Sequence, residues 1–371
     1  MQTLKNGLFG GVLAGAFLVS GAAGAQAAPS VVTTIQPVHS LVSAVMEGVA
    51  TPELLVESGG SPHSYSLRPS QARALEQADA IVWVGEGLET FLQRPLEALG
   101  TDARLVTLSE LPDVQLLETR SGGSWDDHAH GPEGHASRAG NDSHGHDGET
   151  HDHAHHHEDG HHDEADEHEH HDHDEAHRHD GAHDQHDEGG HGNGHVHGSL
   201  DMHIWLAPDN ARAILTGVRD ALSELDPGNS ERYEANTQAA LEEVDSLETE
   251  LQSQLAEVVE RPYIVFHDAY HYFEEAFGLN AVGAVSLNPA RQPSARRMAE
   301  LREKVEQLDA VCVFREPQFE PRLVASLVQG TSVQTGELDP LGVGLEPGPQ
   351  AYFELMRSLG DDISACLRGN G

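Results

Sequence analysis

The segment 121–198 most constrains what this 371-residue chain can fold into. It contains 23 of the chain's 28 histidines and 21 acidic residues, but only two arginines and almost no aliphatic side chains. Such a composition cannot bury enough apolar surface to offset the entropy that a chain loses on folding. We therefore expect 121–198 to be a disordered insert, and the patterned sequence on either side of it to form the folded protein.

The charge balance of the whole chain points to cations as its partners. Its 62 acidic and 21 basic residues give a formal charge of −41, which repels the phosphates of nucleic acids. Two cysteines are too few for a disulfide-rich scaffold or a thiolate zinc finger. Any transition metal would therefore be held mainly by imidazole and carboxylate groups.

Residues 1–28 are typical of a Sec-type secretory signal peptide. Lys5 precedes an apolar run over 8–19, and 25–27 read Ala-Gln-Ala, which predicts cleavage near Ala27 or Ala28. The alternative, a membrane anchor, would need about 20 apolar residues. Export to an oxidising compartment would allow Cys312 and Cys366 to form a disulfide, although two separate buried thiols remain the alternative.

The block 29–120 alternates short β-branched runs with helical patterns, which favours βαβ units and a parallel sheet. The expected strands are 31–35, 54–57, 80–84 and 105–108, and the expected helices are 38–49, 70–78 and 88–99.

The same alternation returns near the C-terminus, after two long helical patterns. Residues 208–225 predict one helix, and 230–259 predict a second that would be long enough to act as a rigid connector. Beyond it the expected strands are 263–266, 281–287, 310–314 and 332–335, and the expected helices are 269–277, 295–308, 322–328 and 350–367.

These patterns predict an α/β protein with two lobes, each a mostly parallel sheet flanked by helices, joined by one long backbone helix. The expected division is 1–28 signal peptide, 29–227 N-terminal lobe containing the insert, 228–260 connecting helix and 261–371 C-terminal lobe. Ligands of open parallel sheets bind beyond the carboxyl ends of the strands, so we look for a site there.

Five histidines lie outside the insert, and three of them occupy such positions. His63 follows the strand expected at 54–57, His203 lies just after the insert, and His267 directly follows the strand expected at 263–266. His39 is expected to be a surface or capping residue at the start of a helix. Three imidazoles from three segments match the ligands that zinc prefers, whereas manganese or calcium would call for more carboxylates.

Asp339 is the candidate for a fourth ligand, because it follows the last expected strand in the run Leu338-Asp339-Pro340. Water could fill the same position instead. The alternative for Asp339 is an ordinary turn residue before a proline.

Several motifs together resemble one known family. They are Ser61-Pro62-His63-Ser64-Tyr65-Ser66-Leu67-Arg68-Pro69-Ser70, Met202-His203-Ile204-Trp205-Leu206-Ala207-Pro208, Phe266-His267-Asp268-Ala269-Tyr270, Cys312-Val313-Phe314-Arg315-Glu316-Pro317-Gln318-Phe319 and Leu338-Asp339-Pro340-Leu341-Gly342. With the histidine-rich insert, they resemble the periplasmic zinc-binding proteins of ABC importers, the ZnuA type of metal-binding solute-binding proteins. The resemblance covers the whole mature chain.

This resemblance implies a periplasmic protein that binds one Zn²⁺ between two lobes with high affinity. It implies the ligands His63, His203 and His267, with Asp339 at the position of a carboxylate ligand in relatives, and a disulfide between Cys312 and Cys366. Some relatives carry an acidic residue where Pro62 stands here, so that candidate ligand is missing from this chain.

The resemblance also implies partners. We expect delivery of zinc to an ABC permease in the inner membrane, exchange with periplasmic zinc chaperones, a monomeric state, and no binding to nucleic acid. Within the insert, the histidines at 155–157 and at 170, 171 and 173 are candidate auxiliary ligands that capture or buffer zinc. They are His155, His156, His157, His170, His171 and His173. The alternative is a solvated acidic tract that binds metal only incidentally.

Two other functions fit parts of the sequence. His267 and His271 have the spacing of an H-E-x-x-H zinc hydrolase, but Asp268 stands where the general base belongs, and that motif requires both histidines on one helix. A secreted zinc buffer or adhesin without a transporter is the other alternative. We therefore expect a zinc transport protein that is not an enzyme.

Overall fold

The computed structural model describes residues 27–57, 59–99, 103–120, 200–286, 294–307 and 310–369. All of these belong to one of the two compact units into which the chain divides. The expected insert 121–198 and nearly all of the expected signal peptide lie outside the described residues. In the part of the chain that is described, every helix is too short or too polar to cross a membrane.

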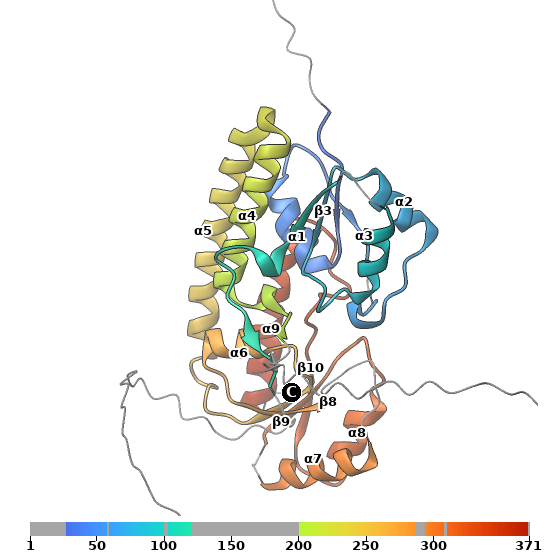
Figure 1. Ribbon diagram of the computed structural model, residues 1–371. Helices are drawn as coiled ribbons and strands as arrows, with labels where there is room; N and C mark the ends of the chain where they lie inside the picture. Colours follow the sequence, from blue (N-terminus) through green and yellow to red (C-terminus); the bar gives the residue numbers. More distant parts are fainter. Residues whose placement is uncertain are drawn as a thin grey trace, which may run out of the picture. The chain divides into compact units, whose positions relative to one another are not determined.

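A four-stranded parallel sheet forms the core of the N-terminal half (Figure 1). Its order is β2-β1-β3-β4, so the chain leaves β1 first toward one edge and then toward the other. The strands are β1 Val31–Thr33, β2 Glu53–Leu54, β3 Ala80–Trp83 and β4 Arg104–Thr107.

Helices cover both faces of this first sheet, as the alternating pattern predicts. On one face, α2 (Pro69–Gln77) and α3 (Gln93–Leu99) pack over a small apolar cluster that contains Ile81 and Trp83 of β3. On the other face, α1 (Gln36–Val45) is buried along its whole length. Proline stands in the first turn of α1 and of α2, where a missing N–H costs nothing.

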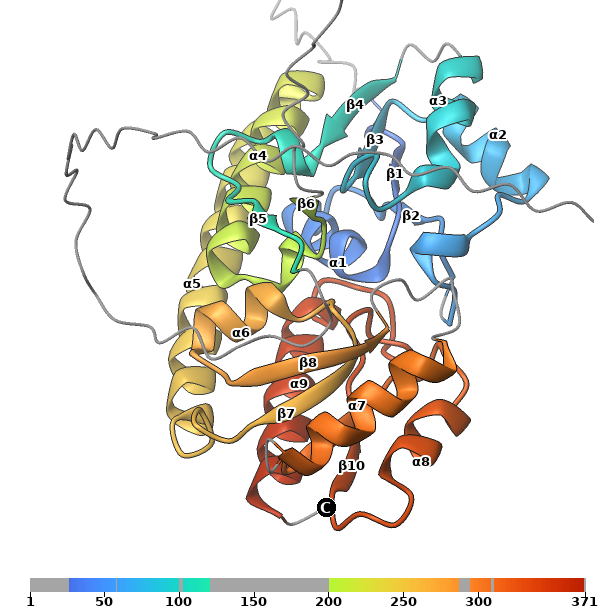
Figure 2. The ribbon, with the colours of Figure 1, turned by 60° about the horizontal axis from the view of Figure 1, so that its bottom comes forward.

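The C-terminal half repeats this arrangement with the order β10-β9-β7-β8, again entirely parallel. Figure 2 shows α7 and α8 covering one face, while α6 and α9 lie on the other. The strands are β7 Tyr263–His267, β8 Ala281–Ser286, β9 Cys312–Arg315 and β10 Gln334–Glu337. The helices are α6 His271–Phe277, α7 Ala295–Gln307, α8 Arg322–Val328 and α9 Ala351–Arg368.

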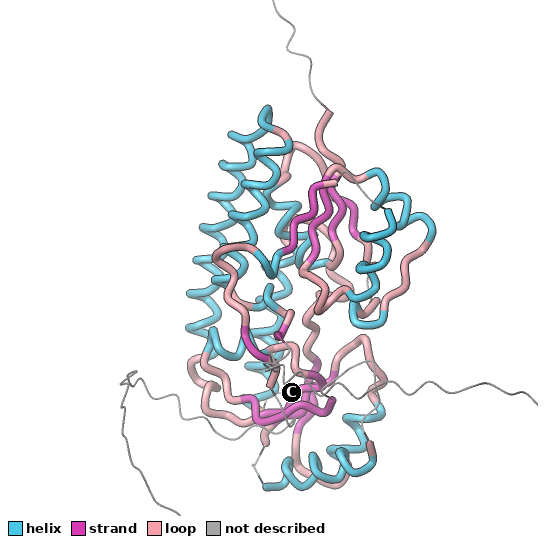
Figure 3. The backbone as a smooth tube through the Cα atoms, viewed as in Figure 1, coloured by secondary structure: helices cyan, strands magenta, loops and turns pink. Residues whose placement is uncertain are grey.

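Two long helices, α4 (Pro208–Leu225) and α5 (Ser230–Leu255), lie side by side next to the N-terminal half, and α5 continues to the C-terminal half, where it packs against α9 (Figures 1 and 3). The buried stripe of α5 faces α4, α1 and α9. One continuous apolar cluster joins these helices to the inner faces of both sheets. The long helix is therefore part of a shared core and is packed along its length.

Two short strands have no signal in the sequence pattern. β5 (Leu117–Glu118) and β6 (Leu200–Asp201) pair as a two-residue antiparallel ladder, with Leu117 opposite Asp201. The ladder joins the two ends of the described chain that flank residues 121–199. It places the residues just before and just after that segment next to each other.

The structure confirms the expected fold class. It also contains the disulfide between Cys312 and Cys366, two residues that are 54 positions apart in the sequence. The expected helix 230–259 ends earlier, at Leu255, and the boundaries of the proposed lobes remain predictions. The expectation for His39 is wrong. Its side chain is buried within α1, where Nε2 lies 3.1 Å from the carbonyl oxygen of Pro52, because α1 packs with all of its faces covered.

Candidate metal centre

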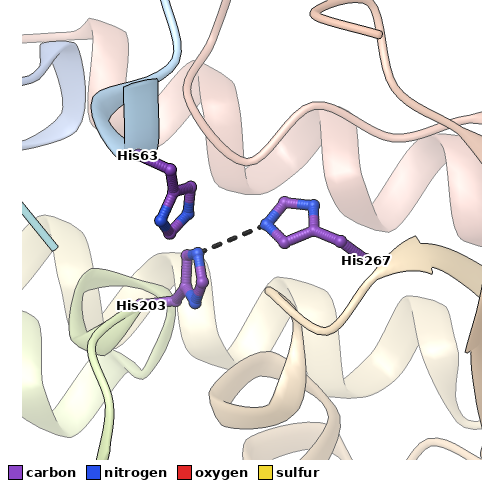
Figure 4. Close-up of side chains that lie close together, drawn as sticks. All are labelled: His63, His203 and His267. Atoms are coloured by element: carbon purple, nitrogen blue, oxygen red, sulfur yellow. Dashed lines mark hydrogen bonds between the residues drawn. The ribbon is translucent and has the colours of Figure 1, made fainter. Parts of the chain in front are cut away.

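Three histidines from three separate segments point toward one another (Figure 4). His63 lies in a single 3₁₀ turn, Pro62–Ser64, in the loop that follows β2. His203 lies just after β6 and before the 3₁₀ turn Ile204–Leu206, and His267 is the last residue of β7. The site therefore combines a loop of the first sheet with a strand end of the second.

One nitrogen from each imidazole lies within 4.8 Å of the other two. Nε2 of His203 and Nε2 of His267 are 3.4 Å apart. Two ligands bound to a tetrahedral zinc ion at ~2.0 to 2.1 Å are separated by ~3.3 to 3.4 Å. These two imidazoles are thus already spaced as a pair of zinc ligands would be.

A buried carboxylate holds His203 in its orientation. Nδ1 of His203 donates to Oδ1 of Asp201 at 2.7 Å, and the backbone N–H of His203 donates to the same oxygen at 3.0 Å. Burial acts to raise the pKa of Asp201, but the charge and hydrogen bonds of His203 lower it overall. Because the carboxylate accepts from Nδ1, the lone pair of Nε2 is left free for a metal.

Glu316 does the same for His267. Nδ1 of His267 donates to Oε1 of Glu316 at 2.6 Å, and Glu316 is 1% exposed. Glu316 directly follows β9, which neighbours β7 in the sheet. The chain leaves β7 toward β8 and returns to β9 on the other side, so this pair lies at the point where the strand order reverses, where open α/β sheets bind ligands.

The protonation of the site differs between its histidines. Burial, with the nearby His203 and His267, lowers the pKa of His63 to about 3. Burial would also lower the pKa of His267, but the charge and hydrogen bond of Glu316 raise it above its ordinary value. His63 is therefore neutral and ready to bind a metal, whereas a proton competes more strongly for His267.

The space between the histidines is small and its other walls are largely apolar. The cavity has a volume of roughly 10 Å³, about what one water molecule or ion requires. Trp205 closes one side and donates from Nε1 to the carbonyl oxygen of Pro340 at 2.9 Å. The remaining lining residues are Ser61, Pro62, Glu316, Gln318, Phe319 and Leu341.

The structure places Asp339 outside the group of three histidines. Its two oxygens accept hydrogen bonds from the backbone N–H groups of Leu341 and Val343, and Oδ1 also accepts from Nε2 of Gln318. The carboxylate thus stabilises the turn that begins at Pro340 by accepting hydrogen bonds from its backbone. In this arrangement Asp339 is a turn residue, which was the alternative to its role as a ligand.

Among the described residues, His271 does not join the group. His271 begins α6, whereas His267 ends β7, so the two do not share a helix as an H-E-x-x-H site requires. The histidines proposed as auxiliary ligands in 121–198 lie outside the described residues.

Sequence reasoning missed Asp201, Glu316 and Gln318. Asp201 precedes His203 by two residues, and Glu316 and Gln318 follow a buried strand. Polar residues directly after a parallel strand are candidates for a site, and this signal would have identified Glu316.

Comparison with known proteins shows the family. The family described as "Zinc-uptake complex component A periplasmic" matches residues 31–366. The High-affinity zinc uptake system protein ZnuA of Brucella abortus (strain 2308) is 42% identical over 357 residues, which cover 96% of this chain and 97% of that protein. The protein of the same name from Paracoccus denitrificans (strain Pd 1222) is 40% identical, covering 91% of this chain and 92% of that protein.

Solved structures show the same fold. A crystal structure of ZnuA has a TM-score of 0.64 at 21% identity and covers 91% of this chain and 99% of that chain. The periplasmic zinc-binding protein TroA from Treponema pallidum also has a TM-score of 0.64 at 21% identity, covering 92% of this chain and 99% of that chain. A zinc-bound ZnuA mutant that lacks residues 138–173 of its own sequence has a TM-score of 0.62 at 21% identity, with coverage of 91% and 98%.

Proposed function

This chain belongs to the family of periplasmic zinc-uptake components, and from that premise we propose that it binds one Zn²⁺ at His63, His203 and His267 and delivers it to an ABC-type importer. The observation that carries the proposal is the convergence of three imidazole nitrogens within 4.8 Å, two of them oriented by buried carboxylates. Carboxylate–histidine–metal arrangements of this kind fix the tautomer and raise the basicity of the ligand.

The donor set favours zinc over harder cations. Among the described residues, the group that could hold an ion consists of imidazoles alone. Calcium and magnesium prefer oxygen ligands and higher coordination numbers, and manganese also prefers carboxylates. Three imidazoles with one further position match the tetrahedral geometry of zinc.

The origin of the ligands suggests how capture is linked to delivery. His63 belongs to the loop after β2 of the first sheet, whereas His267 ends β7 of the second sheet. An ion bound to both therefore tightens the contact between the two halves, where Trp205 already meets Pro340. The permease can distinguish loaded from empty protein only if the metal favours one arrangement of the halves over the other.

The proposal includes a place and a set of partners. We propose that the mature chain acts in the periplasm as a monomer, that its partner is a zinc permease in the inner membrane, and that zinc chaperones exchange metal with it. A hydrolase is disfavoured because His267 and His271 lie on different elements.

We further propose that the tract 121–198 captures zinc and supplies it to the site. The composition of the tract supports this, because its 23 histidines and 21 acidic residues offer many interchangeable ligands. The adjacent β5 and β6 hold both of its flanks beside His203, so the effective concentration of tract ligands near the site is high.

Zinc-edge anomalous diffraction from crystals of the full chain, loaded with one equivalent of zinc, tests the proposal. The strongest anomalous peak should lie between His63, His203 and His267, at ~2.0 to 2.1 Å from one nitrogen of each. A strongest peak at any other position, with none between these histidines, would refute it.

A further inference from the structure

Gln318 is the residue of the cavity wall whose amide oxygen has no assigned role. It follows Glu316 after β9 and lines the cavity together with the three histidines. Its Oε1 is buried and has no hydrogen-bond partner among the described residues. A buried acceptor without a partner costs free energy. We therefore expect a donor from outside the described residues to bind this atom.

The orientation of this amide is fixed by its neighbours. Nε2 of Gln318 lies 2.7 Å from Oδ1 of Asp339, and both oxygens of Asp339 accept from the backbone N–H groups of Leu341 and Val343. Because those oxygens act as acceptors, the atom of Gln318 that faces them must be the NH₂ group. Gln318 lines the cavity, whereas Asp339 does not. Because Nε2 of Gln318 faces Asp339, Oε1 is the polar atom of Gln318 that remains available to a molecule in the cavity.

A zinc ion bound to the three histidines would supply the donor that Oε1 lacks. Three imidazoles leave the fourth position of a tetrahedral ion open, and the cavity has room for about one small molecule. A water bound there has two protons to donate. Oε2 of Glu316, in the same wall, is likewise buried and has no hydrogen-bond partner among the described residues.

We propose that Gln318 accepts a hydrogen bond through Oε1 from the water molecule that occupies the fourth position on the bound ion, and that Asp339 is a positioning residue that holds the amide in this orientation. The proposal rests on the proposed zinc function. It assigns the fourth position to water, and it gives Asp339 a task that does not require contact with the metal.

Zinc affinity of matched variants tests this assignment. Gln318→Leu keeps the approximate size of the side chain but removes its whole amide, Oε1 and Nε2 together. Zinc should then bind roughly tenfold more weakly, within the range for loss of an outer partner of a metal site. Gln238→Leu, an exposed glutamine on α5, is the control and should bind as the wild type does. Equal affinity of the Gln318→Leu and wild-type proteins would overturn the proposal.

A double-mutant cycle separates positioning from direct ligation. If Asp339 acts through Gln318, then Gln318→Leu should cause no further loss of zinc affinity in an Asp339→Ala background, because the two residues act as one unit. If the two losses multiply, Asp339 acts independently and the positioning role is wrong.

The zinc-loaded crystals give a readout that does not depend on any variant. The expected result is an oxygen that belongs to no side chain, bound to the zinc and within hydrogen-bond distance of Oε1 of Gln318. An Asp339 oxygen, Oε1 itself, or a water that does not contact Gln318 at the fourth position would overturn the inference while leaving the proposed function intact. Absence of zinc from the three histidines would instead refute the proposed function.

Discussion

His203 and His267 each donate from the ring nitrogen that faces away from the metal position to a carboxylate that is almost completely buried. Burying a carboxylate costs free energy unless the carboxylate is paired. Asp201 and Glu316 are each paired with a histidine, and these pairs fix the orientation of the two imidazole rings. His63 has no such partner in its own turn, and burial, together with the nearby His203 and His267, lowers its pKa and keeps it neutral. The site thus has two oriented ligands and one neutral ligand that arrives from the other half.

Asp201→Asn tests the contribution of one of these carboxylates. The amide keeps the shape of the side chain but removes its charge, so His203 becomes a less basic ligand and zinc affinity should fall by ~10- to 100-fold. The measurement is competition with a chelator of known affinity. Asp209→Asn, at a carboxylate that is 73% exposed on α4, should leave the affinity unchanged. Equal losses in the two variants would mean that charge in general, and not the contact with His203, is responsible.

The affinity for zinc should fall as the pH is lowered, and the fall should begin above pH ~6.5, the ordinary pKa of histidine. Burial acts to lower the pKa of His267, but Glu316 raises it overall, and only the neutral imidazole binds a metal. Below this raised pKa, a proton on His267 alone costs about tenfold in affinity for each pH unit. His63, with a pKa of about 3, adds no competition until far more acidic pH.

Chelator competition between pH ~5 and ~8 measures this dependence. Glu316→Gln removes the negative charge beside His267, so the onset of the fall should move to lower pH in that variant. An onset that stays at the same pH in Glu316→Gln would contradict the role of Glu316.

At the scale of elements, the site depends on where parallel strands end. His267 ends β7 and Glu316 follows β9, and these strands are neighbours because the chain reverses its direction of travel across the sheet between them. The alternating sequence pattern predicts the parallel strands, and the carboxyl-end rule then predicts His267 as a site residue. The adjacency of β7 and β9 depends on the strand order, which no local pattern contains, so the contact between Glu316 and His267 could not be predicted from local sequence.

The local sequence also did not predict the environments of residues whose surroundings depend on tertiary contacts. His39 was expected at the surface because it lies near a helix start after Pro37, but α1 is enclosed on all sides by the sheet, α4, α5 and α9. Asp339 could be either a ligand or a turn residue on sequence grounds. Its oxygens accept from the nearby N–H groups of Leu341 and Val343 and also from Gln318, which lies 21 residues earlier and reaches Asp339 only in the folded chain.

The disulfide joins β9 to α9 and should stabilise the fold. Replacing both cysteines by serine should lower the free energy of unfolding by ~4 kcal/mol, because the bond closes a loop of 54 residues in the unfolded chain. Urea denaturation followed by circular dichroism measures the loss, and the wild type under reducing conditions should behave like the double variant. A loss of less than ~1 kcal/mol in both cases would show that chain entropy does not describe this bond.

At the scale of the whole molecule, the two sheets share a single apolar cluster with α1, α4, α5 and α9. The sequence predicts the two α/β blocks and the long helix well, because each has a strong periodic pattern. It does not predict how the blocks share a core, because that depends on which faces of α5 and α9 meet. It also does not reveal β5 and β6, whose two residues each are too few to form a pattern.

The short ladder of β5 and β6 makes a test of the tract 121–198 feasible. Because Glu118 pairs with Leu200, the flanks of the tract are adjacent and a short glycine-containing turn can replace it. The shortened chain should bind fewer zinc ions in total, because the tract histidines are gone, but should keep one tight equivalent. Equilibrium dialysis with zinc analysis measures both numbers. Loss of the tight equivalent would mean that the tract supplies a ligand to the site.

The most direct test of a single tight zinc site made by His63, His203 and His267 is the zinc affinity of the three single alanine variants. Each should bind zinc more weakly by more than the ~10- to 100-fold that loss of an outer partner costs. His39→Gln, which removes a buried histidine outside the site, should lower stability but leave the zinc affinity of the folded protein unchanged. Unchanged affinity in all three alanine variants would contradict the assignment of these histidines as the zinc ligands.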